Sequence, residues 1–263
     1  MRGRAAEWLL PLSVLVLFLA AWEYAAAQYW LRPIQFPPPS RLASSFVDLA
    51  TRGFPQGITL WSHAGTTIGR ILLGHALAVA LAVPIGIVIG SYPLVERMTS
   101  TIVTFCRSVA TLSLLPLAIV WFGTGETAKI FLIGYGCFWV MLPATIAAVK
   151  LVDPVLIRAA RTMDATPGII FRQVVLPASL PRLLSGARVA LGVGFMVIVG
   201  AEMIGTIHGL GSLIMEARTF YRTDITMVGM FCIGGFGLLV MFVLARLEAW
   251  LVPWQARQEA QQK

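Results

Sequence analysis

Long apolar stretches alternate with short polar segments along the chain, and their lengths set the first expectation. An α-helix needs about 20 residues to cross a hydrocarbon layer about 30 Å thick. The stretches that approach or exceed this length run from about Trp8 to Trp30, Trp61 to Gly90, Thr99 to Phe122, Thr127 to Val149, Pro181 to Ile204 and Ile225 to Trp250. The pattern predicts an all-α polytopic membrane protein of about six transmembrane helices, formed as a single domain over residues 1–263.

The N-terminal stretch has features of both a signal peptide and a membrane anchor. Arg2 and Arg4 precede it, and Ala25-Ala26-Ala27 offers the small residues that suit signal-peptide cleavage. An apolar run of about 20 residues is, however, too long for the hydrophobic region of a signal peptide. We therefore expect a retained anchor helix over residues 8–30.

Two polar segments interrupt the apolar pattern. Residues 31–57 are rich in proline and contain a short amphipathic stretch from Ser40 to Leu49, for which Ser40 is a suitable N-cap. Met203 to Arg222 is rich in glycine and charge, which indicates a short surface or re-entrant helix rather than a crossing. We expect the core helices to lie within residues 61–250 and the segment 31–57 to be periplasmic.

The distribution of Lys and Arg predicts the orientation in the membrane. Six crossings place both termini on one side, together with the polar loop over residues 150–180. Eleven Lys and Arg residues lie on that side and six on the other. Because basic residues concentrate on the cytoplasmic side, we expect both termini and the loop in the cytoplasm of a bacterial inner membrane.

Small residues recur at every fourth position in three rows, which lie within two of the predicted spans. Such rows allow helix backbones to approach closely in lipid, so we interpret them as packing surfaces. The rows are Gly65 and Gly69; Ala78, Ala82, Gly86 and Gly90; and Gly186, Ala190 and Gly194.

Composition agrees with a membrane protein and argues against several other classes. Hydrophobic residues make up 58% of the chain and charged residues 12%, and the mean hydropathy is +0.82. Soluble proteins average about 45–50% and about 25%. The net charge of +8 is spread among apolar segments without a Lys/Arg run and interleaved aromatics, so nucleic-acid binding is not expected. Cys106, Cys137 and Cys232 lie within predicted spans, where we expect them to pack in the core.

The chain lacks the sequence signatures of an enzyme. No Gly-x-x-x-x-Gly-Lys-Ser/Thr occurs, so it has no usual loop for nucleotide phosphates, and any energy from ATP must come from a partner. His63, His75 and His208 are scattered and lack ligand spacing. We therefore expect no catalytic centre, no metal site and no cofactor in this chain.

The loop over residues 150–180 is the most informative segment. Asp153-Pro154 is a strong helix start, because the carboxylate can cap the first turn and proline suits the first helical position. A helix is predicted from Val155 to Ala165. Thr166-Pro167 repeats the start signal, so a second helix is predicted from Gly168 to Leu176-Pro177. Two helices that meet at an angle form a corner that can dock into a groove on another protein.

The same loop resembles the "EAA" loop of ABC importer permeases. Arg158-Ala159-Ala160, Asp164 and Val174-x-Leu176-Pro177 have its spacing, with Arg158 in place of Glu and Asp164 in place of Gly. Asp tolerates left-handed backbone better than most residues, so we expect the corner to persist. Four other segments are similar to the nitrate/sulfonate/taurine branch of that family, namely Pro116 to Glu126, Ala201-Glu202-Met203, Gly209-Leu210-Gly211 and Pro253-Trp254.

The resemblance implies the type I importer permease fold and a set of partners. These are a second permease, identical or related, two cytoplasmic ATPase subunits that bind ATP and Mg²⁺, and a periplasmic substrate-binding protein. It also implies that the loop contacts the ATPase. The residues expected at this contact are Arg158, Ala159, Ala160, Arg161, Asp164, Ala165 and Gly168.

Charged residues inside the predicted spans are candidates for the translocation pathway, because they usually face a bundle interior or a wet cavity. Arg107 lies beside Thr104, Ser108 and Thr111 at helical spacing. Arg188 and Glu202 lie about 21 Å apart in one predicted helix, so each needs another partner or water.

Purely structural roles for these charges stay open, since arginines can snorkel or bridge helices, and we expect Arg70 to reach the interface or cap a helix contact. Arginines bind sulfonate, nitrate or carboxylate through paired donors, which favours an anionic solute, with sulfonate or taurine ahead of nitrate. The alternative function is a self-sufficient channel or ion-coupled carrier for a small anion.

Overall fold

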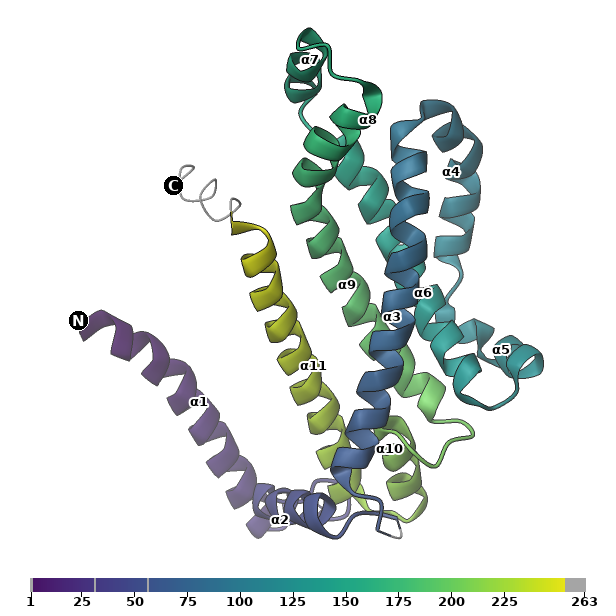
Figure 1. The fold of residues 1–263 in the computed structure, drawn as a ribbon. Coiled ribbons are helices and arrows are strands. Elements are labelled where there is room, and N and C mark those ends of the chain that lie inside the picture. Colours follow the sequence, from purple (N-terminus) through teal and green to yellow (C-terminus); the bar gives the residue numbers. More distant parts are fainter. Residues whose placement is uncertain (1, 31, 56, 254–263) are drawn as a thin grey trace. The chain divides into compact units, whose positions relative to one another are not determined.

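The computed structural model describes residues 2–30, 32–55 and 57–253, and within these ranges the regular structure is entirely helical (Figure 1). The chain divides into two compact units. One comprises Met1–Thr66 and Ile207–Gly234, and the other comprises Thr67–Thr206 and Gly235–Lys263. The predicted all-α class is confirmed.

The number of membrane-spanning helices is close to the prediction. Within the described residues, helices long and apolar enough to cross a membrane are α3 (Leu60–Ser91), α6 (Glu126–Lys150), the run Pro167–Glu202, and Thr223–Trp250 of α11 (Thr223–Leu251). A bent pair can form a fifth span. The first predicted stretch lies in α1 (Arg2–Ala27), whose side chains are described only from Ser13 onward, so its role as an anchor stays a prediction. Trp254, Arg257 and Lys263 lie outside the described residues.

The third predicted span is not one helix, and that expectation was wrong. It divides into α4 (Pro93–Ser108), a 3-10 turn η1 (Thr111–Leu114) and α5 (Leu115–Phe122), with an 81° bend between the two parts. Val109 and Ala110 adopt extended backbone at the break. Pro116 in the first turn of α5 has no amide hydrogen with which to continue the helical ladder of the preceding segment.

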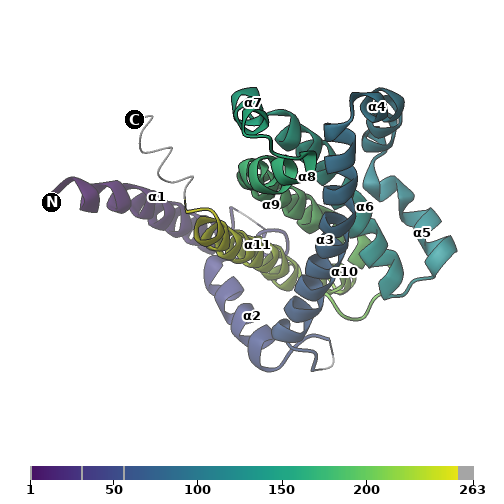
Figure 2. The same ribbon diagram turned by 45° about the horizontal axis from the view of Figure 1, so that its top comes forward.

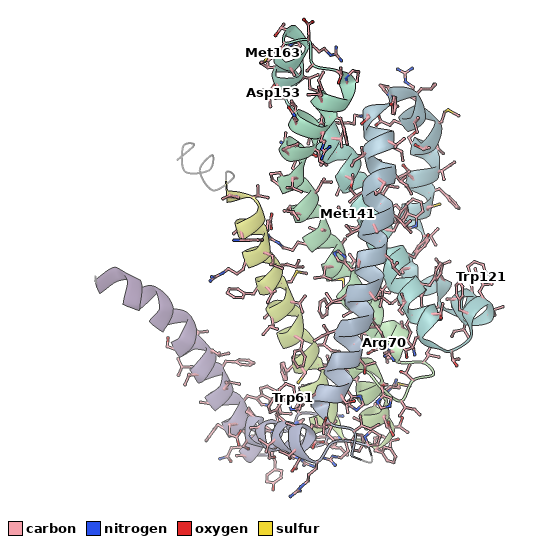
Figure 3. The ribbon with its side chains drawn as sticks, viewed as in Figure 1. Trp61, Arg70, Trp121, Met141, Asp153 and Met163 are labelled. Atoms are coloured by element: carbon pink, nitrogen blue, oxygen red, sulfur yellow. The ribbon has the colours of Figure 1, made fainter. Side chains whose placement is uncertain are left out.

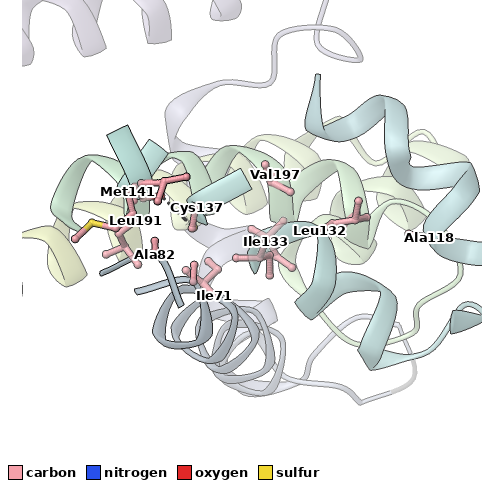
Figure 4. Close-up of a cluster of buried hydrophobic side chains, with 14 of the residues drawn as sticks. Ile71, Ala82, Ala118, Leu132, Ile133, Cys137, Met141, Leu191 and Val197 are labelled. Atoms are coloured by element: carbon pink, nitrogen blue, oxygen red, sulfur yellow. Dashed lines mark hydrogen bonds between the residues drawn. The ribbon is translucent and has the colours of Figure 1, made fainter. Parts of the chain in front are cut away.

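The core of the second unit forms around α6, which packs against α3 and α9 (Leu176–Glu202) (Figures 1 and 2). Ile71, Leu132, Ile133, Met141 and Leu191 are buried there (Figure 4), and the Cys137 thiol donates to the Ala190 carbonyl at 3.2 Å. The predicted core role of that cysteine is confirmed.

Two of the three small-residue rows serve as packing surfaces. A Cβ built at Gly86 would lie 2.6 Å from the Thr145 Cβ, and one built at Gly186 would lie 2.8 Å from the Ala144 Cβ. Both contacts are with α6. The row of Gly65 and Gly69 was wrongly interpreted as a packing surface, because a Cβ built at either residue meets no heavy atom within 4 Å.

In the first unit the polar segments form short helices. The amphipathic stretch is α2 (Pro39–Thr51), which starts one residue before the predicted N-cap; the Ser40 hydroxyl and amide instead bind the Glu23 carboxylate at 2.7 and 3.0 Å. Asp224 at the start of α11 accepts hydrogen bonds from Ser45 of α2 and from Arg222. The Met203–Arg222 segment contains α10 (Leu210–Thr219), whose 10 residues are too few to cross a membrane, as expected.

The loop after α6 contains the predicted corner. Helix α7 (Pro154–Thr162) is capped by Asp153, whose carboxylate accepts from the Val155 amide at 2.8 Å. Asp164 has a φ of 51°, the left-handed conformation that its position was expected to require. Both features confirm the sequence interpretation.

The second helix of the loop does not stop at Leu176-Pro177, as was predicted. Helix α8 (Pro167–Ile170) leads through a π-helical turn η2 (Phe171–Val175) directly into α9, and the helical run continues to Glu202. Pro177 lies in the first turn of α9. Proline removes one backbone hydrogen bond, and the wider π-helical turn just before it changes the bonding pattern, which lets the helix continue.

The packing of α3 on α6 generates a test. Gly86→Ala forces a methyl group against Thr145, and overpacking of this kind costs about 1–3 kcal/mol. We expect a lower melting temperature of the detergent-purified protein. Gly69→Ala in the same helix is the matched control, since its methyl group meets open space and Ala favours helix over Gly. Equal melting temperatures for the two variants would contradict the close approach of α3 and α6.

Candidate functional site

A cavity of about 630 Å³ lies beside α4 and α6 in the second unit. The polar face of α4 forms one wall, and the C-terminal half of α6 forms the other. The lining includes Thr104, Arg107 and Ser108, three of the residues predicted for the pathway. Thr111 is not part of the cavity, because the helical stripe ends where α4 ends; it lies in η1 beside Gly136.

The hydroxyl groups of the α4 wall are already engaged. Thr99, Ser100, Thr104 and Ser108 each donate a hydrogen bond to a carbonyl three or four residues earlier in the same helix. A hydroxyl has a single proton to donate, so these oxygens offer only acceptor capacity to the cavity. The donors for a negatively charged solute must therefore come from other side chains.

Arg107 is the cationic side chain at one end of the cavity. It lies in the last turn of α4, where a cation interacts favourably with the C-terminal end of the helix dipole. Its side chain is exposed, and among the described residues no carboxylate forms an ion pair with it. A guanidinium group with five N–H donors is thus available to a solute.

The other end of the cavity holds an ion pair that the sequence did not reveal. The Lys150 Nζ lies 2.7 and 2.9 Å from the two Glu96 carboxylate oxygens. Glu96 lies in the first turn of α4, and Lys150 is the last residue of α6, immediately before the loop that carries α7. Both residues stand in the sequence as ordinary charges at the ends of predicted spans, 54 positions apart.

Arg188 and Glu202 lie outside the cavity, and each has a partner of its own. Arg188 forms an ion pair with Glu248 of α11. The Glu202 carboxylate accepts from the Arg70 Nη1 at 2.7 Å and from the Thr67 hydroxyl at 2.9 Å. The expectation that the two residues are too far apart to pair with each other, and need partners elsewhere, is confirmed.

Arg70, labelled in Figure 3, is the centre of a buried charge cluster. Of the two roles expected for it, reaching the interface was wrong, whereas a contact between helices is what the structure shows. Its guanidinium binds Glu126 through two N–H groups, at 2.5 Å each, in addition to Glu202. Lys129 lies 3.6 Å from the same Glu126 carboxylate. The cluster therefore joins α3, α6 and α9.

The cluster is suited to a structural role rather than to solute binding. Arg70, Lys129 and Glu202 have side chains at most 5% exposed, and the two cations balance the two carboxylates. Charges are costly inside a membrane unless they are paired, so this arrangement stabilises one packing of the three helices. Two hints existed in the sequence, namely the charges within apolar spans and the position of Glu126 in a family-like segment.

The residues predicted for partner docking lie at the tip of the loop, where Figure 3 labels Asp153 and Met163. Arg158, Ala159, Arg161, Asp164 and Gly168 are exposed, and Ala160 and Ala165 are half-buried. The Ala165 amide donates to the Ala160 carbonyl at 3.2 Å, which closes the end of α7. Large apolar side chains on this loop are also exposed: Leu151, Val155, Leu156, Met163 and Ile169. Such a surface is typical of an interface.

Candidate metal ligands do not gather in the part of the chain that the structure describes, where no group of three His, Cys, Asp or Glu residues is found. His63 illustrates the reason. Its two ring nitrogens lie 2.9 Å from the Gly209 carbonyl and 3.1 Å from the Phe54 carbonyl, within the first unit.

Comparison with known proteins finds a family model and several relatives, all of them described as transport components. Residues 82–257 match the family model described as "Binding-protein-dependent transport system inner membrane component". The chain is 34% identical to the taurine transport system permease protein TauC of Escherichia coli, over 97% of this chain and 95% of that protein. It is 31% identical to the putative aliphatic sulfonates transport permease protein SsuC of the same organism, over 95% and 92%.

A cyanobacterial relative and a solved structure extend this set. The bicarbonate transport system permease protein CmpB of Synechocystis is 28% identical, over 97% of this chain and 92% of that one. A chain of the MetNI methionine ABC transporter in an inward-facing conformation superimposes with a TM-score of 0.62, at 23% identity, over 72% of this chain and 95% of that chain. The structural likeness shows a common fold.

The buried charge cluster predicts that loss of the Glu202 carboxylate destabilises the protein more than loss of a carboxylate elsewhere. Glu202→Ala leaves the cluster with one excess positive charge away from water, and breaking a buried pair costs about 3–5 kcal/mol. We expect a marked fall in melting temperature and in the yield of folded protein. The control is Glu216→Ala on α10, which removes a carboxylate for which no side-chain partner is found among the described residues. A Glu202→Ala protein as stable as this control would show that the cluster is not needed for stability.

Proposed function

Because the chain belongs to the family of binding-protein-dependent transport system inner membrane components, we propose that it forms part of the translocation pathway of an ATP-driven importer for a small anion. In this family the chain is a transport subunit and not an enzyme. The observation that carries the proposal is the α4–α6 cavity. Its hydroxyl groups donate to carbonyls of their own helix, and Arg107 supplies a cation without an ion-pair partner among the described residues.

The chemistry of this wall supports an anionic solute. A guanidinium group binds a sulfonate, carboxylate or nitrate through two parallel hydrogen bonds. The relatives named for taurine, aliphatic sulfonates and bicarbonate support the same class. Our proposal is a sulfonate or taurine-like solute, or nitrate, which Thr104, Arg107 and Ser108 bind transiently during translocation. Thr111, Arg188 and Glu202 lie outside this cavity and are assigned supporting roles.

The partners are those that an importer of this family requires. We assign α7 and the corner after it to docking on a cytoplasmic ATPase subunit, of which the complex contains two, with ATP and Mg²⁺ bound there. A second permease, identical or related, completes the pathway, and a periplasmic binding protein delivers the solute. The whole chain then acts as one permease domain in the inner membrane, with both termini cytoplasmic. Family membership argues against a self-sufficient channel or carrier.

The role of Arg107 is tested by Arg107→Gln in the reconstituted importer. Hydrogen bonds to charged groups contribute about 1.5–3 kcal/mol, so we expect uptake of labelled taurine to fall roughly tenfold or more while the complex assembles and binds ATP normally. Arg97→Gln removes an exposed arginine from the same helix, one that does not line the cavity, and should transport at the normal rate. Equal transport by both variants would remove Arg107 from the pathway.

The docking assignment is tested by Ala160→Glu. The new side chain both clashes with a fitted groove and buries a charge without a partner, so ATPase copurification should fall, or hydrolysis should become uncoupled from uptake. Because α7 lies outside the predicted spans, permease abundance should be unchanged. Thr219→Glu places the same charge at an exposed position, the last residue of α10, and should leave coupling intact. If Ala160→Glu also assembles and transports normally, α7 is not the docking element.

A further inference from the structure

Resting on the proposed function, we infer that Lys150 is a second anion-binding residue of the cavity. When no solute is present, the Glu96 carboxylate takes the place of the solute at Lys150. The ligand class is the same as for Arg107, a small sulfonate or a similar oxyanion. In this arrangement the solute passes from Arg107 at one end to Lys150 at the other, where it replaces the Glu96 carboxylate.

The geometry places the two cations at opposite ends of one cavity. Glu96 and Arg107 lie 11 residues apart on α4, which corresponds to about 16 Å along the helix axis. Glu96, Arg107 and Lys150 all line the cavity, so both cations face the same space. A solute that interacts with Arg107 therefore meets one further cation before it leaves the cavity at the Glu96 end.

The ion pair is of a kind that can exchange its partner. The side chains of Lys150 and Glu96 are 49% and 34% exposed, respectively. Water and salt screen a pair in such a position, so it is held weakly, unlike the buried Arg70–Glu202 pair. An ammonium group is also a flexible point charge with three donors, which can turn from a carboxylate to an incoming sulfonate.

The position of Lys150 connects this exchange to the loop. Lys150 ends α6, and the carbonyl of the next residue, Leu151, accepts a hydrogen bond from the Arg182 guanidinium of α9 at 2.9 Å. Helix α7 begins three residues later, at Pro154. A movement of α7 therefore acts first on the chain segment that carries Lys150. This arrangement allows the release of Glu96 to depend on the state of the docked partner.

The experiment measures the charge preference of the cavity without a transported solute. Ser100 lines the cavity one turn from Glu96, so Ser100→Cys in a Cys106→Ser background provides a reporter thiol. In the assembled importer, its rate of reaction is compared for a sulfonate-bearing and a trimethylammonium-bearing methanethiosulfonate. The ratio of the two rates reports the electrostatic potential at the Glu96 end.

We expect Glu96→Gln to raise the anion-to-cation ratio by about threefold or more, because it leaves the Lys150 charge uncompensated close to the reporter. The double variant Glu96→Gln/Lys150→Gln should return the ratio to near its starting value. In the transport assay with taurine as the probe, Lys150→Gln should lower the maximal rate severalfold, and Lys150→Arg should restore most of it.

An unchanged ratio in Glu96→Gln, or full transport by Lys150→Gln, would overturn the inference. These results are distinct from a failure of the proposed function. If taurine is not transported at all, the proposed function fails, but the reagent ratio still reports on Lys150. If only Arg107→Gln impairs uptake, the proposed pathway is supported and the second anion-binding site at Lys150 is excluded.

Discussion

A charged side chain within the hydrocarbon layer must find its partner inside the protein, and the second unit is organised by that constraint. Arg70 satisfies it by binding two carboxylates on different helices, so a shift of α9 against α3 would leave the buried Arg70 and Glu202 charges without each other. Lipid provides little hydrophobic force between helices, which leaves close backbone contact as the other source of stability. Gly86 and Gly186 supply that contact on the two sides of α6.

The same constraint distinguishes the cavity from the rest of the unit. Arg188 and Glu202 are neutralised by neighbours, whereas Arg107 is not paired among the described residues and the Lys150–Glu96 pair is half-exposed. Because the hydroxyls of α4 donate to their own helix, the wall can accept hydrogen bonds from a solute at many points but donate to it at few. Under the proposed function, selectivity for anions would depend on the two cationic side chains at the ends of the cavity, Arg107 and Lys150.

Much of the fold was predictable from local signals, and what was missed depends on contacts distant in sequence. The Asp153 cap, the start of α7 and the left-handed Asp164 follow from a few adjacent residues. The partners of Arg70 are 56 and 132 residues away, and no periodicity points to them. The break after Ser108 lies in a run that reads as continuous apolar sequence, while prolines suggested an end near Pro177 that a π-helical turn avoids. In both places backbone geometry, rather than hydropathy, decides the outcome.

The continuous helix from Pro167 to Glu202 gives the loop a mechanical connection to the far end of the unit. At 1.5 Å per residue its 36 residues span about 54 Å, and an α-helix resists compression along its axis far better than it resists bending. The π-helical turn at Phe171–Val175 and Pro181 inside α9 are the places where this run can bend, and both lie close to the loop end. A push on α8 would therefore be divided there, with its axial part carried along the helix to the Glu202 end and its sideways part taken up as local bending. The helix would thus transmit force along its axis and lose force applied across it.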